Sequence, residues 1–121
     1  MLWRISKGTP YVPSPLLLGD RLIFTQANNA LLTIFNRKTG KPIVDRERLP
    51  VDGAQFYASP IAAAGRIYLI TRDGTALVLR QGDRVEILAI NRLNDAVDAS
   101  PVAVGRQLFL RGEKALYCVE E

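Results

Sequence analysis

Carboxylate and amide side chains are the residues best suited to bind a cation or act as an acid or base. Asp52 lies before one apolar stretch, and Asn91, Asn94, Asp95 and Asp98 lie before another. Their oxygens are of the kind that binds calcium, and a carboxylate can act as a general base. Asp and Asn in loops more commonly hydrogen-bond the backbone of their own turn. We therefore interpret all five as turn or capping residues, and we assign no catalytic residue, cofactor or metal ligand.

Aromatic side chains form a second group of candidates. Tyr11, Phe56 and Tyr57 lie on segments that lead into apolar stretches. Exposed aromatic residues at such places would anchor a partner peptide or protein, although packing inside a core explains them equally well. The candidate partner-binding residues are Tyr11, Asp52, Gln55, Phe56, Tyr57, Asn94 and Asp95.

Histidine is absent from the 121 residues, and Cys118 is the only cysteine. The absence of histidine excludes hydrolase triads built on that residue and removes the commonest metal ligand. A single cysteine excludes an internal disulfide framework and a cysteine-based structural zinc site. Cys118 lies within an apolar stretch, so we expect it to be a small buried residue. No enzyme is predicted.

The net charge of +4 raises the question of a polyanionic partner. The densest basic group, Arg37, Lys38 and Lys41, brackets Thr39-Gly40, where charge solvates a turn. Interleaved aromatics are missing, so nucleic-acid binding is not predicted. No apolar run approaches the length of about 18 residues that crosses a membrane, and the N-terminal residues lack the apolar core of a signal peptide. We therefore expect neither a membrane span nor an export signal.

These candidates are positioned by elements that repeat along the chain. Ser-Pro occurs three times, at Ser14-Pro15, Ser59-Pro60 and Ser100-Pro101, with spacings of 45 and 41 residues. Each Ser-Pro precedes a short apolar stretch and then a two-residue turn, in which glycine supplies the positive φ that a tight hairpin needs. The turns are Gly19-Asp20, Ala64-Gly65 and Gly105-Arg106.

The segments around these turns are short and rich in β-branched and aromatic residues, which favours strands over helices. The first unit has expected strands at 16–18, 22–24, 30–35 and 42–45. The second has them at 61–63, 67–69, 76–79 and 85–89. The third has them at 102–104, 108–110 and 115–119, and lacks a fourth.

Four antiparallel strands in each period of about 40 to 45 residues are typical of a β-propeller blade. The sequence predicts an all-β chain with blades at residues 12–46, 57–90 and 98–120. Three blades are too few to close a ring, because propellers typically have four to eight. Residues 1–5 could supply the missing strand to another copy, so that two chains form a six-bladed ring. Alternatively, the chain is a fragment of a longer propeller.

The repeats resemble those of the pyrroloquinoline-quinone-type (PQQ-like) propeller family over nearly the whole chain. That family has the motif Ala-x-Asp-x-x-Thr-Gly-x-x-x-Trp between the third and fourth strands, and its tryptophan docks one blade on the next. This chain keeps Thr39 and Gly40, has Asn36 in place of the aspartate, and lacks the tryptophan at the motif's end. Trp3 lies where the tail of a preceding motif would end, which indicates that the chain begins inside a blade.

The resemblance implies a non-catalytic role outside the cytoplasm, similar to that of the bacterial outer-membrane assembly lipoprotein propellers. The expected function is that of a protein-interaction scaffold, whose partner is a protein or further blades and which forms a homo-oligomer. The alternative is a portion of a quinoprotein-like dehydrogenase or sensor whose catalytic residues lie outside this chain. Calcium or quinone affinity would favour that alternative.

Overall fold

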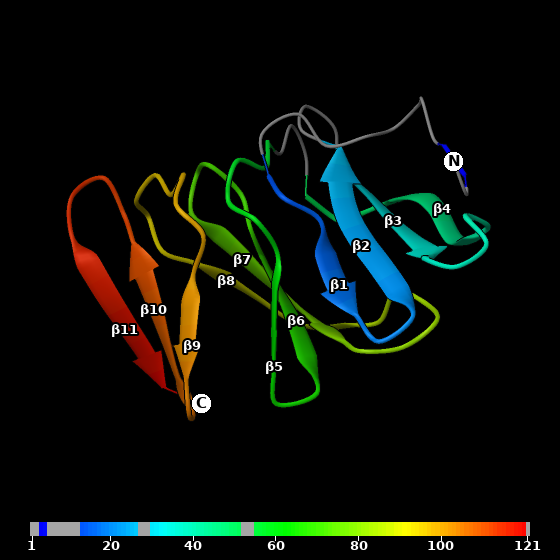
Figure 1. Ribbon diagram of the computed structural model, residues 1–121. Coiled ribbons are helices and arrows are strands. Elements are labelled where there is room, and N and C mark those ends of the chain that lie inside the picture. The colour runs from blue at the N-terminus through cyan, green and yellow to red at the C-terminus, as the bar shows by residue number, and fades with distance from the viewer. Residues whose placement is uncertain (1–2, 5–12, 27–29, 52–54, 121) are drawn as a thin grey trace.

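The computed structural model describes residues 3–4, 13–26, 30–51 and 55–120. Their strands form three separate antiparallel sheets, arranged one after another along the chain (Figure 1). No helix occurs among these residues, and so none that could cross a membrane. The fold class is all-β, composed of propeller blades, as the repeats predict.

Each sheet is one blade, with its strands in sequence order. The first contains β1 (Leu16–Leu18), β2 (Arg21–Gln26), β3 (Leu31–Asn36) and β4 (Pro42–Arg48). The second contains β5 (Ile61–Ala63), β6 (Arg66–Ile70), β7 (Thr75–Arg80) and β8 (Ile87–Arg92). The third contains β9 (Val102–Val104), β10 (Gln107–Arg111) and β11 (Leu116–Glu120). The short first strands of successive blades contact one another, β1 with β5 and β5 with β9.

The hairpin turns have the backbone that the repeats predict. Gly19, Gly65 and Gly105 have φ values of 61°, 76° and 60°, in the left-handed region that glycine enters without steric cost. Ala64 also has a positive φ, of 52°, so the second turn has the sign pattern of a type I′ hairpin. These turns fix the register of the first two strands in every blade.

β4 and β8 extend furthest past their expected C-terminal bounds, because pairing continues beyond the apolar residues. β4 extends to Arg48 through an irregularity in its register with β3, where Arg46 has a φ of 48° and its N–H donates to Thr33 Oγ1. β8 starts later than expected and ends at Arg92, which pairs with Thr75 at the start of β7. Residues 27–29, which connect β2 to β3, lie outside the described residues.

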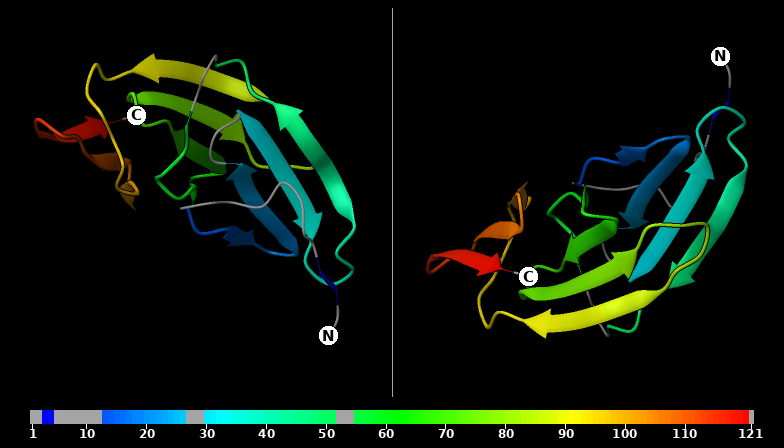
Figure 2. Two further views of the ribbon diagram at one scale, coloured as in Figure 1. Left: turned by 90° about the horizontal axis from the view of Figure 1, so that it is seen from above. Right: turned by 90° about the horizontal axis from the view of Figure 1, so that it is seen from below.

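Neighbouring blades pack face to face, and we call the face toward the following blade the forward face and the opposite one the rear face. Forward-facing Ile23, Leu32 and Ile34 of the first blade share a buried core with rear-facing Leu69 and Leu77 of the second. The second core joins Tyr68 and Ile70 of the second blade to Leu108 and Leu110 of the third. Figure 2 shows the three sheets following one another in a curved row.

A chain of serine hydrogen bonds links the blades at the repeated Ser-Pro positions. The Ser14 N–H donates to Ser59 Oγ at 2.8 Å, and the Ser59 N–H donates to Ser100 Oγ at 2.9 Å. The repeat serines of the second and third blades thus each satisfy a backbone donor of the blade before them. The Ser-Pro signal therefore marks the contact between blades as well as the start of a strand.

Cys118 is exposed, so the expectation that it is buried is wrong. It pairs with Phe109 and lies on the forward face of the third blade. Ile34 occupies the equivalent position in the first blade. The second blade covers Ile34, so only 2% of this residue is exposed. The apolar surroundings were predicted correctly, but no described residue forms a further blade over the third.

Candidate functional site

Two entry segments, residues 55–60 and 93–101, lead into β5 and β9 and carry most of the predicted site residues. Phe56 and Val97 each lie three residues before the repeat serine, and both are buried, at 1% and 0% exposure. Phe56 belongs to the first interblade core and Val97 to the second. Phe56 therefore packs within this chain.

Arg72, which the sequence analysis did not single out, joins the two entry segments. Its N–H donates to the Gln55 carbonyl at 2.8 Å, and its own carbonyl accepts from the Val97 N–H at 2.9 Å. The guanidinium lies 4.0 Å from the centre of the Tyr57 ring, and its Nε lies 2.7 Å from Asp98 Oδ1. The hydrogen bond with Asp98 raises the pKa of Arg72, although burial opposes this.

Asp95 is the one buried carboxylate among the described residues, with 5% exposure. It accepts from the Lys114 N–H at 3.0 Å and from the Tyr117 hydroxyl at 2.9 Å, so it ties the second entry segment to the β10–β11 turn. Burial would raise the pKa of Asp95, but these hydrogen bonds, with another from the Ala96 N–H, lower it below the ordinary value. Asp95 therefore caps a turn 19 residues away, whereas the sequence predicts hydrogen bonds within its own turn.

The remaining candidates lie apart from one another or outside the described residues. Asn94 is exposed and adopts a left-handed backbone with a φ of 59°, and Asn91 belongs to β8. Tyr11 and Asp52 fall outside the described residues. Within the part of the chain that is described, no three acidic or cysteine side chains gather as a metal site would require.

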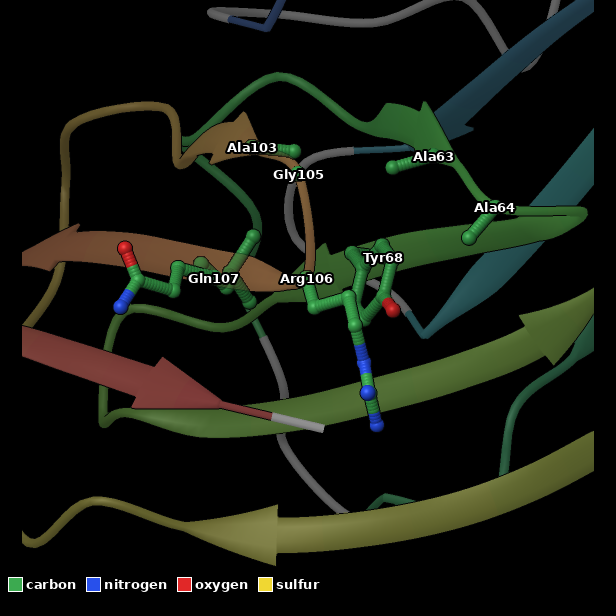
Figure 3. A pocket seen from close by; sticks show the side chains of 8 residues that line it. Ala63, Ala64, Tyr68, Ala103, Gly105, Arg106 and Gln107 are labelled. Carbon is green, nitrogen blue, oxygen red and sulfur yellow. The ribbon is translucent and has the colours of Figure 1, made fainter.

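Two hollows lie near opposite ends of β10, and the second of them lies at the contact between the second and third blades. One, of about 490 Å³, is lined at the entry side by Asp98, Arg111 and Glu113 together with small residues. The other, of about 10 Å³, has the size of a single water site and lies between the hairpins that follow β5 and β9. Figure 3 shows Tyr68 and Arg106 in this smaller hollow, with Ala63 and Ala103 nearby.

A larger groove of about 590 Å³ opens between the outer parts of the same two blades. Tyr68, Ala76 and Val78 line it from the forward face of the second blade, and Leu108 and Leu110 line it from the rear face of the third. Ala89 and Asn91 of β8 and Val119 of β11 complete its wall. The groove is mainly apolar, and its floor is formed by residues of the second core.

The third blade also has an open face and an open edge in the described structure. Val102, Val104 and Leu116 on its forward face are 57%, 58% and 72% exposed. β11 pairs with β10 alone, so its other side presents backbone donors and acceptors that no described strand meets. Exposed edges and apolar faces of this kind mark interaction surfaces or aggregation hazards.

Trp3 lies against the rear side of the first blade. Its indole N–H donates to the Arg37 carbonyl at 2.7 Å, and its ring stacks on Phe35 with a centroid distance of 6.4 Å. A Cβ built at Gly40 would lie 2.6 Å from Trp3 Cγ, so the indole occupies the space that glycine leaves free. Trp3 thus docks on the Thr39-Gly40 turn that carries the family resemblance.

Comparisons with known proteins bear on the fold. No family model and no curated protein matches the chain. Among solved structures, BamB from Moraxella catarrhalis is similar with a TM-score of 0.70 and 16% sequence identity, over 86% of this chain. The match spans 29% of the BamB chain, so the present sequence corresponds to less than a third of that propeller. The described structure is that of consecutive β-propeller blades similar to those of BamB.

Proposed function

We propose that this chain is a non-catalytic interaction scaffold, made of PQQ-like propeller blades that bind a protein through the exposed end of the third blade. The observation that carries the proposal is the apolar forward face formed by Val102, Val104 and Leu116. The equivalent face of the first blade is buried by the second, and that of the second is buried by the third. The surface is therefore suited to pack against another propeller blade or a partner of similar shape.

Burial of this apolar surface would contribute to binding. Complete burial of one aliphatic side chain contributes about 1.5 to 3 kcal/mol, before the cost of association is subtracted. The three exposed side chains lie together with Phe109 and Cys118 on one face of a regular sheet, which presents them to a single partner. The resemblance to the outer-membrane assembly lipoprotein propellers supports a role outside the cytoplasm.

A second copy of the chain is a partner that fits this surface. Two chains of three blades would form a six-bladed ring, which lies within the usual range for propellers. In such a ring, the forward face of one third blade would lie against the rear face of the other chain's first blade. The exposed Leu17 lies on that rear face.

The test is the solution mass of the chain by light scattering over a tenfold concentration range. We expect a dimer or larger assembly that a Val104→Lys variant weakens at least about tenfold, because a buried charge costs several kcal/mol. Glu47→Lys, which adds a lysine on exposed β4, serves as the matched control and should leave the mass unchanged.

Two results would contradict the proposal. One is equal behaviour of the wild type and Val104→Lys, because the forward face would then have no part in binding. The other is saturable binding of calcium or a quinone by calorimetry, which would indicate a quinoprotein-like site in place of a non-catalytic scaffold.

A further inference from the structure

The two interblade contacts differ in their outer parts. At the first contact, Val85 and Ile87 in and before β8 pack against a core that contains Val44 of β4. At the second contact, the corresponding space is the 590 Å³ groove, because no described strand lies beside β11. The groove and the open edge of β11 therefore both mark the place where a fourth strand of the third blade would lie.

Trp3 occupies the complementary place at the other end of the blade row. Val44 faces forward from the outer strand of the first blade and packs toward the second blade. Trp3 packs toward the rear face of the first blade, through Phe35 and the Gly40 turn. Trp3 thus bears the relation to the first blade that Val44 bears to the second.

We propose that the groove is filled in trans: the segment around Trp3 of a second copy adds as an antiparallel strand to β11. This inference rests on the proposed interaction surface and identifies the element that completes it. The added strand would satisfy the free backbone groups of β11, as in other cases of strand addition. Trp3 would keep its contacts with Phe35 and Arg37 of its own chain, because that chain's first blade is the next blade in the ring.

The register of the added strand follows from the first blade. In the first blade, Val44 of β4 pairs with Ile34 of β3, and Ile34 pairs with Ile23 of β2. Ile23 lies nine residues after the repeat serine of its blade. Cys118 pairs with Phe109, which is also nine residues after its serine. In the strand added to the third blade, the position equivalent to Val44 therefore lies opposite Cys118. Trp3 of one copy takes this position, opposite Cys118 of the other copy.

The single tryptophan and the single cysteine allow a direct test with full-length chains. One chain carries Trp3→Phe and a nitroxide label on Cys118, and the other keeps Trp3 and carries Cys118→Ser. With the labelled chain in excess, we expect Trp3 fluorescence to decrease about twofold or more at concentrations that favour assembly, since the nitroxide quenches on contact. The matched control carries the label at Glu47→Cys in a Trp3→Phe, Cys118→Ser chain, and we expect no quenching from it.

A second measurement covers the case in which the label itself blocks docking. A Trp3→Cys variant with native Cys118 should form a disulfide between copies under mild oxidation, because directly opposed residues in paired strands lie within bonding reach. The same variant with Cys118→Ser should not form it. An assembly that shows neither quenching nor this disulfide would overturn the strand exchange while leaving the scaffold function standing. A chain that stays monomeric would also overturn the exchange.

Discussion

At the scale of single residues, polar side chains hold the entry segments against the turns of neighbouring strands. Arg72 contacts Gln55, Tyr57 and Asp98, and Asp95 binds Lys114 and Tyr117. Buried carboxylates need partners of this kind, because an unpaired one would lose more in desolvation than packing returns. The entry segments are therefore held in place by specific hydrogen bonds.

Asp95 should make the stability of the chain depend on acid. Its pKa is lowered in the folded state, so its contribution is present above the ordinary value of about 4 and is lost as the pH falls through the folded pKa. We expect the urea midpoint of the wild type to fall more steeply below about pH 4 than that of Asp95→Asn. Tyr117→Phe, which removes one donor to the carboxylate, should show an intermediate dependence. Identical slopes in all three proteins would contradict this role.

Residue-level roles were predicted unevenly from the sequence. A turn or capping role was expected for Asp95 because Asp in a loop often bonds its own backbone, but its partners Lys114 and Tyr117 lie 19 and 22 residues away and could not be read from the sequence. Arg72 was missed because its partners Tyr57 and Asp98 lie 15 and 26 residues away, and only the packed blades bring them together. The exposure of Cys118 was mistaken because burial of a blade face depends on the next blade.

At the scale of elements, the repeat made most of the fold predictable. Turn glycines and short β-branched runs are local signals, so the strands around them were predicted almost completely. The longer extents of β4 and β8 could not be read from the sequence, since Arg48 and Arg92 are polar residues recruited by the pairing of β3 and β7. Local pattern determines which elements exist, and tertiary pairing determines where they end.

The serine hydrogen bonds should contribute to the coupling of the blades. Ser59→Ala and Ser100→Ala each remove a hydroxyl that accepts a backbone N–H, so each should destabilise the chain by about 1 kcal/mol. Ser14→Ala is the matched control, because its hydroxyl has no such partner in the described part of the chain. Urea unfolding of the three variants distinguishes them, and an effect of Ser14→Ala equal to the other two would contradict the interpretation.

At the scale of the whole molecule, the blades form an open row whose last member lacks both a covering blade and a fourth strand among the described residues. Each interior blade gains stability from two neighbours, as in other repeat structures. In the part of the chain that the structure describes, the first and third blades have one neighbour each, so their stability depends on what binds there. The proposed binding would take place at these two ends.

Association should therefore raise thermal stability. A tenfold increase in concentration should stabilise an assembled chain by up to about 1.4 kcal/mol, because a partner that binds only the folded state acts by mass action. We expect the thermal midpoint of the wild type to rise with concentration and that of Val104→Lys to stay constant. Calorimetric or circular-dichroism scans at several concentrations test this, and a constant wild-type midpoint would count against assembly.

The serine chain has a further consequence for symmetry. Each link has a donor on one blade and an acceptor on the following blade, so the row has a polarity like that of a filament with distinct ends. Two copies joined through identical surfaces would place acceptor against acceptor or donor against donor. Growth must then be head to tail, and a head-to-tail contact either closes into a ring or continues as a fibre. The angle between successive blades decides between a finite assembly and an unlimited one.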